Sequence, residues 1–207
     1  MAKKYHERRK EDERKERIVT DFAEIKILKK FPDYRRNKEV ITQKLGNDFE
    51  FTGRDGYHYI CDLKAIFKSI PTGCLECACR INRNNNWDTY INGWFLNERE
   101  IANTYVMFWL DEFNKEMKSI EDIKHGEICF IKKERLWDYI KECGFSKEAI
   151  MQKIEEIKNN PERYFKTEWI SDVGFNCPKN YYDAERPVNI LLKRNIYREL
   201  SIYTLKF

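Results

Sequence analysis

Three charged residues near the start of the chain, Asp48, Asp62 and Lys64, have the types and spacing of a metal-dependent site. Two neighbouring carboxylates can hold a hard cation such as Mg²⁺ through oxygen ligands. A lysine beside that cation orients or activates water, or stabilises the negative charge that develops on a phosphate. The three residues therefore predict a cation site if the fold brings them to one face.

A predicted β-hairpin would position these residues. Alternating apolar side chains indicate strands over residues 49–52 and 57–67, and residues 53–56 (GRDG) are a tight-turn sequence. Because strand side chains alternate, Asp62 and Lys64 point to the same face, about 6–7 Å apart along the strand. The hairpin thus accounts for one acid and the lysine.

Two further acids come from neighbouring elements. Asp48 opens the paired strand, and Glu24 lies on a predicted amphipathic helix over residues 18–30. Glu24 reaches the same cation if that helix covers the sheet, so Glu24, Asp48 and Asp62 are the predicted metal ligands. A solvated hairpin face explains the same charges without chemistry, because 36% of the chain is charged.

A second register is also open. In it the two acids are Asp62 and Glu76, Ala78 stands where the lysine belongs, and Arg80 is the cation left on that face. Glu76 is therefore a candidate catalytic residue beside Asp62 and Lys64.

Aromatic and basic residues surround a predicted polar loop over residues 82–86. Aromatic faces together with cations stack on and clamp a nucleic-acid strand, but the same side chains also suit a lid packed on the core. The predicted nucleic-acid-binding residues are Arg80, Arg83, Trp87, Trp94 and Arg99.

Three cysteines, Cys74, Cys77 and Cys79, form a dense cluster near Cys61. Thiolates at this spacing bind Zn²⁺ or an iron–sulfur cluster in some proteins. Cys77 and Cys79 share one strand face while Cys74 points to the other, which is poor tetrahedral geometry. The pattern favours buried core cysteines.

Composition excludes several classes of protein. The 207 residues carry 39 Lys+Arg and 35 Asp+Glu, a net charge of +4, and 42% are hydrophobic, too many for intrinsic disorder. No apolar run approaches the roughly 20 residues of a membrane span, and the N-terminus lacks an apolar signal region. Seven cysteines in a chain of this size indicate a reducing cytoplasm.

The order of elements predicts an α/β fold, a single mixed sheet flanked by helices. Residues 1–17 are predicted as a charged helical extension, 18–145 as the core, and 146–207 as a C-terminal helix, an irregular connection over 161–187 and a closing element.

Asn47-Asp48 followed by Asp62-Leu63-Lys64 resembles the PD-(D/E)XK motif of nucleases, with Asn47 where that family usually has proline. Over residues 18–145 the chain is similar to small phage- and plasmid-type proteins of that superfamily. The resemblance implies a restriction-endonuclease-like fold. It also implies Mg²⁺ or Mn²⁺ bound by Asp48 and Asp62, Lys64 as the motif lysine, and Glu24 as the helical acid.

Two functions follow as expectations. The first is a metal-dependent nuclease that hydrolyses phosphodiester bonds in DNA. The alternative is a catalytically inactive, nuclease-like binding or inhibitory protein of a phage or mobile element. Such a protein would act on a protein partner through its N-terminal helix or aromatic loop. The same helix is also a candidate surface for homodimerisation.

Overall fold

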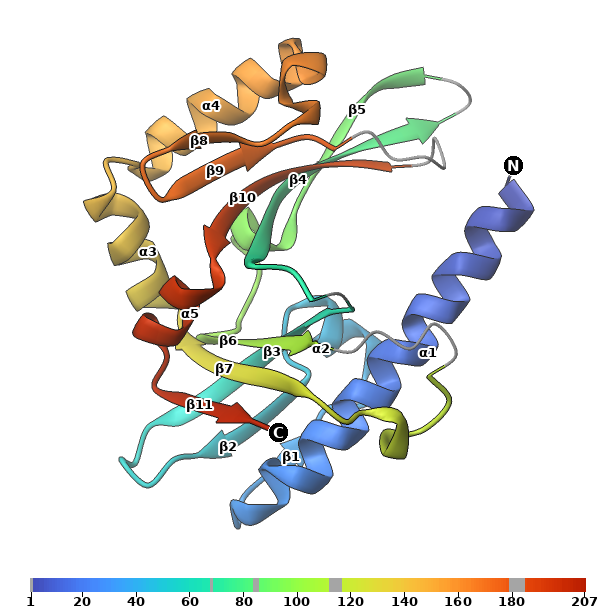
Figure 1. Ribbon diagram of the computed structural model, residues 1–207, viewed down its shortest axis with the longest axis vertical. Coiled ribbons are helices and arrows are strands. Elements are labelled where there is room, and N and C mark those ends of the chain that lie inside the picture. Colours follow the sequence, from blue (N-terminus) through green and yellow to red (C-terminus); the bar gives the residue numbers. More distant parts are fainter. Residues whose placement is uncertain (1, 68, 84–85, 112–116, 179–184) are drawn as a thin grey trace. The chain divides into compact units, whose positions relative to one another are not determined.

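The computed structural model describes residues 2–67, 69–83, 86–111, 117–178 and 185–207. Within these ranges the chain is α/β, with five α-helices and two β-sheets (Figure 1). The chain divides into two compact units. The six-stranded unit comprises Ala2–Pro71, Arg99–Arg135 and Tyr197–Phe207, and the five-stranded unit comprises Thr72–Glu98 and Leu136–Ile196.

The six-stranded unit is built on a mixed sheet in the order β1-β2-β3-β6-β7-β11. Neighbouring strands are antiparallel except for β3 and β6, which are parallel. The strands are β1 (Arg35–Arg36), β2 (Phe49–Thr52), β3 (His58–Ile66), β6 (Thr104–Leu110), β7 (Gly126–Lys132) and β11 (Tyr203–Lys206). The remaining elements are α1 (Ala2–Lys26), η1 (Leu28–Lys30), α2 (Val40–Lys44) and η3 (Ile120–Asp122).

The predicted hairpin is confirmed as β2 and β3. Phe49 pairs with Cys61 and Phe51 with Tyr59, and the Gly53 N–H donates to the Tyr57 carbonyl across the turn. The alternation therefore places the apolar side chains on one face of the sheet and Asp62 on the other.

The charged N-terminal helix is also confirmed, as one continuous helix that crosses a face of the sheet (Figure 1). Before Ile18 it carries ion pairs, such as those of Glu11 with Arg14 (2.7 Å) and with the buried Lys15 (3.2 Å). Further along, apolar residues at helical spacing are buried against the sheet. They are Ile18, Val19, Phe22, Ala23 and Ile27, which cluster with Phe49, Phe51, Tyr59, Cys61, Val106, Phe108 and Phe130.

The sequence TYVMFWL over residues 104–110 is a continuous apolar run rich in β-formers, which predicts a central buried strand; the structure confirms it as β6. All seven of its residues are buried, because it lies between β3 and β7 and both of its faces are covered. Trp109 packs on Tyr197 at 5.3 Å between ring centroids, and Phe108 packs on Phe22 at 5.9 Å.

The five-stranded unit has the strand order β5-β4-β10-β9-β8, with all neighbours antiparallel. Its strands are β4 (Thr72–Arg83), β5 (Asn86–Asn92), β8 (Glu168–Ile170), β9 (Val173–Asn176) and β10 (Glu185–Lys193). Its other elements are η2 (Trp94–Leu96), α4 (Lys147–Asn159) and η4 (Pro161–Phe165). Helices α3 (Lys133–Glu142) and α5 (Arg194–Leu200) each contain a boundary between the two units.

Two predictions about the sheets are wrong. The single mixed sheet is in fact two sheets, because after Pro71 the chain starts β4, which pairs with β5 and β10 rather than with β3. The irregular connection over residues 161–187 contains β8 and β9. These strands have only three and four residues, so they show too little alternation for the period to be read.

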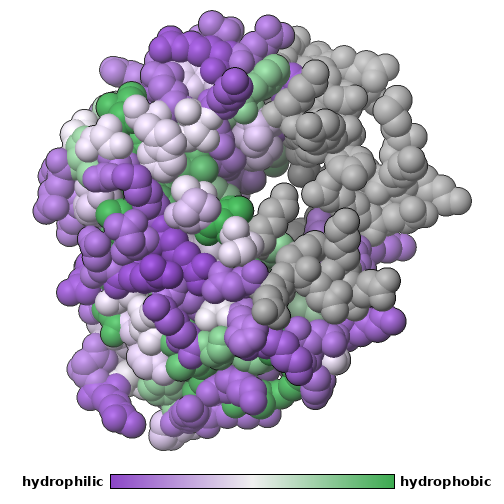
Figure 2. All heavy atoms as spheres, viewed as in Figure 1, coloured by the Kyte–Doolittle hydropathy of each residue, from purple (hydrophilic) through white to green (hydrophobic). Residues whose placement is uncertain are grey.

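Hydrophilic side chains dominate the face shown in Figure 2. Among the described residues, no helix combines the length and apolar character that a membrane span requires.

Candidate active site

The short segment between α2 and β2 fixes the position of Asp48. Gly46, with a φ of +79°, ends the turn after α2 in a conformation that favours glycine. The Asp48 backbone N–H then donates to the Cys61 carbonyl (2.9 Å), and its Oδ2 accepts from the Leu63 N–H (2.7 Å). These two bonds hold the Asp48 carboxyl group against β3, at the level of Asp62.

Strand β3 supplies the other two predicted residues. Asp62 is 4% exposed, and its Oδ2 lies 2.8 Å from Nζ of Lys64, two residues further along the same face. Burial alone would lower the pKa of Lys64, but the charge of Asp62, helped by Asp48 and Glu100, outweighs it and raises that pKa. Lys64 is therefore a cation at neutral pH.

Asp48 and Asp62 act on each other. Burial, and next the charge of Asp62, raise the pKa of Asp48 to about 7 against the opposing effects of the Leu63 N–H and Lys64. One buried and one partly buried carboxylate that repel each other near a single lysine are typical of a site with excess negative charge when no metal ion is bound. The structure thus brings Asp48, Asp62 and Lys64 together.

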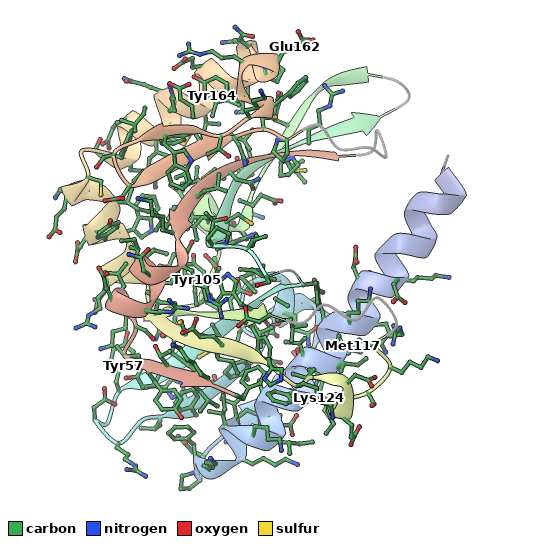
Figure 3. All side chains as sticks on the ribbon, in the orientation of Figure 1. Tyr57, Tyr105, Met117, Lys124, Glu162 and Tyr164 are labelled. Atoms are coloured by element: carbon green, nitrogen blue, oxygen red, sulfur yellow. The ribbon has the colours of Figure 1, made fainter. Side chains whose placement is uncertain are left out.

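A third acid, Glu100, adjoins the same cluster and was missed from the sequence. Its Oε2 accepts from the Tyr105 hydroxyl (2.8 Å) and from Nζ of Lys133 (2.6 Å), and its side chain is 2% exposed. Burial raises the pKa of Glu100 to about 7 despite these two donors, and interaction with Asp62 contributes to the rise. Tyr105, labelled in Figure 3, comes from β6, whose register places it beside Asp62 on β3.

Because Gly46 has no side chain, Glu100 can pack directly against its backbone. A Cβ on Gly46 would lie 2.7 Å from Cγ and 2.9 Å from Oε1 of Glu100. Glu100 lies in a connection without periodicity, so only its place shortly before the buried strand β6 could have pointed to it.

The helical acid at the site is Glu16 rather than Glu24. Glu16 and Asp48 line one pocket of about 280 Å³, the Asp48 pocket, together with Glu13, Arg17, Thr20, Arg36 and Gln43. Partial desolvation raises the pKa of Glu16, although the residue remains exposed, and the charges of Lys64 and Asp62 also act on it. Glu24 lies eight residues later, about 12 Å along the helix, and it pairs with Arg36 (3.1 Å) and Lys29 (3.9 Å).

The remaining predicted residues are divided between the two units. Glu76 belongs to β4 of the five-stranded unit, where it pairs with Asn189 of β10. The same unit contains Trp94, whose neighbour Phe95 is buried and stacks on Trp137 at 4.5 Å, as in a segment packed on a core. Arg99 is exposed and belongs to the six-stranded unit.

The predicted nucleic-acid-binding residues Arg80, Arg83 and Trp87 have side chains outside the described part of the structure. Their backbones lie in β4 and β5. Of the loop predicted over residues 82–86, residues 82 and 83 belong to β4 and residue 86 begins β5.

The oxygen donors of the cluster suit a hard cation. Mg²⁺ is commonly held by one or two carboxylates and completes its shell with water and substrate phosphates, so Asp48 and Asp62 suffice as protein ligands. Oδ2 of Asp62 is buried and pairs with Lys64 (2.8 Å), while Oε1 of Glu100 is buried without a hydrogen-bond partner among the described residues. Within those same residues, no group of three or more His, Cys, Asp or Glu side chains is arranged to hold a metal ion. The cluster of Cys74, Cys77 and Cys79 is therefore not arranged as a metal site either.

The seven cysteines are free thiols. Cys61, Cys77 and Cys79 are buried while Cys74 is exposed, as expected of core cysteines on alternating faces of a strand.

Comparison of the chain with protein-family models, with characterised proteins and with solved structures finds no match.

Proposed function

We propose that the chain is a metal-dependent nuclease that hydrolyses phosphodiester bonds in DNA. The observation that carries the proposal is the pair of buried Asp62 and partly buried Asp48, with Nζ of Lys64 2.8 Å from Asp62. A restriction-endonuclease-like core is part of the proposal. Its support is the order of elements in the six-stranded unit, a helix followed by the β2–β3 hairpin that holds these residues.

Asp48 and Asp62 would hold Mg²⁺ or Mn²⁺, which supplies Lewis-acid activation of the scissile phosphate and of water when bound. Because the pKa of Asp48 is about 7 without the cation, Asp48 gives up its proton as the cation binds. Binding is therefore expected to weaken as the pH falls below 7.

Lys64 has the other chemical role. Its ammonium, fixed by Asp62, would orient the attacking water and stabilise the charge that develops on the phosphate oxygens. The water oxygen forms the new bond to phosphorus, the bond to the leaving sugar oxygen breaks, and that oxygen departs with a proton. Glu100, in the connection before β6, and Lys133, at the start of α3, would support Asp62.

The test is cleavage of single-stranded, double-stranded and branched DNA in Mg²⁺ or Mn²⁺. Asp62→Asn and Lys64→Ala are each expected to reduce the rate by about 10²-fold or more, the scale of losing one transition-state contact. Glu155→Gln is the control, because Glu155 is an exposed acid of α4 in the five-stranded unit, where it pairs with Lys158 (2.6 Å). Absence of cleavage of all three substrates in both metals would refute the proposal.

A nuclease-like protein without catalysis is the second candidate. It is favoured by the short ion pair between Asp62 and Lys64, because the lysine neutralises one acid without a bound metal ion. If cleavage is absent, co-elution of the intact protein with a stoichiometric protein partner from host lysate would support this reading.

A further inference from the structure

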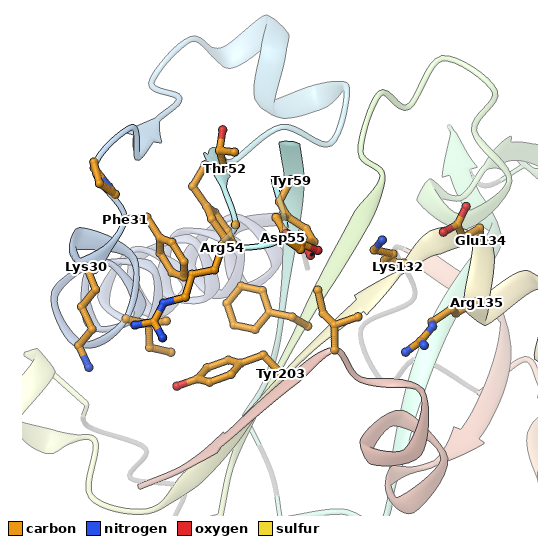
Figure 4. A pocket seen from close by; sticks show the side chains of 16 residues that line it. Lys30, Phe31, Thr52, Arg54, Asp55, Tyr59, Lys132, Glu134, Arg135 and Tyr203 are labelled. Atoms are coloured by element: carbon orange, nitrogen blue, oxygen red, sulfur yellow. Dashed lines mark hydrogen bonds between the residues drawn. The ribbon is translucent and has the colours of Figure 1, made fainter. Parts of the chain in front are cut away.

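A large groove lies in the six-stranded unit, apart from the Asp48 pocket. Its volume is about 1250 Å³, and elements η1, β2, β7, β11 and the β2–β3 turn contribute to it (Figure 4). Pockets for small ligands usually measure about 300–1,000 Å³. The size of the groove therefore favours a segment of a polymer over a single small molecule.

The floor of the groove is aromatic. Phe31 packs on Phe51 at 4.3 Å between ring centroids, Phe51 lies 6.2 Å from Phe130, and Phe130 lies 5.8 Å from Tyr203. Phe51 and Phe130 are buried, while Tyr203 at one end is 47% exposed and Phe31 at the other is partly exposed. The series thus ends in two rings that remain accessible for stacking.

Four cations line the groove. In Figure 4, Lys30 and Arg54 lie to one side of the aromatic rings, and Lys132 and Arg135 lie to the other. Three of the four, Lys30, Arg54 and Arg135, are exposed. An occupant that meets cations at both ends and rings in between carries separated negative charges and flat apolar groups.

Two acids, Asp55 and Glu134, also line the groove. Asp55 is already bonded, since its carboxylate accepts from the Tyr59 hydroxyl (2.7 Å) and the Tyr57 N–H (3.2 Å). These bonds lower the pKa of Asp55 and keep it charged, but four cations against two acids still leave the groove positive.

We propose that this groove binds a single-stranded segment of nucleic acid, whose bases stack on Tyr203 and Phe31 and whose phosphates contact Lys30, Arg54, Lys132 and Arg135. The choice of polymer rests on the proposed nuclease function. Bases in a duplex are stacked on each other and do not reach an aromatic floor, whereas those of a single strand do. An acidic peptide would pair with the cations but would stack less well on the flat rings.

The experiment measures fluorescence anisotropy of a labelled oligothymidine of about ten nucleotides, within the range of sites in single-strand-binding domains. The buffer contains EDTA, so binding is measured without cleavage. Tyr203→Ala is expected to weaken binding about tenfold, since stacking contributes about 1–3 kcal/mol per base and about 1.4 kcal/mol is tenfold. Tyr203→Phe keeps the ring and should retain the affinity.

A second variant tests the cations without touching the sheet. Lys30→Ala combined with Arg54→Ala removes two exposed charges and should reduce the slope of log affinity against log salt by about 1.4, or about 0.7 for each phosphate contact. Lys29→Ala is the matched control, because Lys29 is the neighbouring lysine of η1, is exposed, and pairs with Glu24 outside the groove.

Affinity and salt slope that are the same in wild type, Tyr203→Ala and the double variant would overturn the groove assignment. The assignment would also be overturned if labelled polyglutamate bound more tightly than the oligonucleotide and lost this binding in the same variants. That result would identify an acidic peptide as the occupant. Because these measurements are made without metal, they test binding in the groove separately from cleavage. The binding proposal can be refuted while cleavage is observed, and the nuclease proposal can be refuted while the groove binds.

Discussion

The excess charge at the Asp48 site should cost the metal-free protein stability at high pH. Burial and Asp62 raise the pKa of Asp48 from its ordinary value of 3.8 to about 7. Between these values the folded state holds a proton that the unfolded state has lost, so stability falls as the pH rises through this window. With about 1.36 kcal/mol for each pKa unit, the loss reaches at most about 4 kcal/mol above pH 7. This figure is a ceiling, because Asp48 is only partly buried and lines a pocket, where solvent screens its charge.

Asp48→Asn removes the charge and retains an oxygen that can accept from the Leu63 N–H. In EDTA, urea unfolding at pH 9 should show the variant to be more stable than wild type by up to about 4 kcal/mol. At pH 4 the difference should be small, because Asp48 is then protonated in the folded protein. Added Mg²⁺ should stabilise wild type at pH 9 and leave the variant unchanged.

Asp33→Asn is the matched control. Hydrogen bonds from Thr52 lower the pKa of the exposed Asp33, so its charge favours the folded state and the substitution should not stabilise the protein at pH 9. If Asp48→Asn is no more stable than wild type at pH 9, the carboxylate of Asp48 is neither desolvated nor repelled, and the proposed cation site loses its main support.

Two further predictions concern packing. Phe22→Ala, in the core beneath α1, should lower the free energy of unfolding by about 3–5 kcal/mol in urea titration, whereas Ile25→Ala, 47% exposed on the same helix, should change it little. Gly46→Ala should destabilise more than Gly144→Ala. Both glycines have positive φ, and the left-handed conformation costs alanine about 1–2 kcal/mol. Only at Gly46 does the new Cβ also clash with Glu100. Equal losses at the two glycines would show that the Glu100 contact is not tight.

Local pattern was enough to predict the hairpin and the central strand. The alternation around Asp62 fixes the face on which it lies, and the uninterrupted apolar run of β6 indicates burial on both sides. These features depend on neighbours in sequence, so they can be read from sequence alone.

The residues that distant segments contribute to the site could not be predicted from local pattern. Choosing Glu16 instead of Glu24 requires the position of α1 along the sheet, and several acids of that helix have equivalent spacing. Glu100 joins the cluster because β6 runs parallel to β3 and Tyr105 and Lys133 anchor it, which no local period encodes. The second sheet was missed because β4 pairs with β10, about a hundred residues later.

That pairing also sets the order in which the molecule can be completed during synthesis. Strand β4 is made early, yet its partner β10 ends at Lys193, and β11, which pairs with β7, ends at Lys206. At about 5–20 residues per second, β4 waits about 5–20 seconds for β10. The five-stranded sheet therefore cannot be completed until Lys193 has left the ribosome, and the six-stranded sheet cannot be completed until Lys206 has. The apolar faces of β4 and β6 are exposed during that interval, which makes the nascent chain a candidate substrate for chaperones.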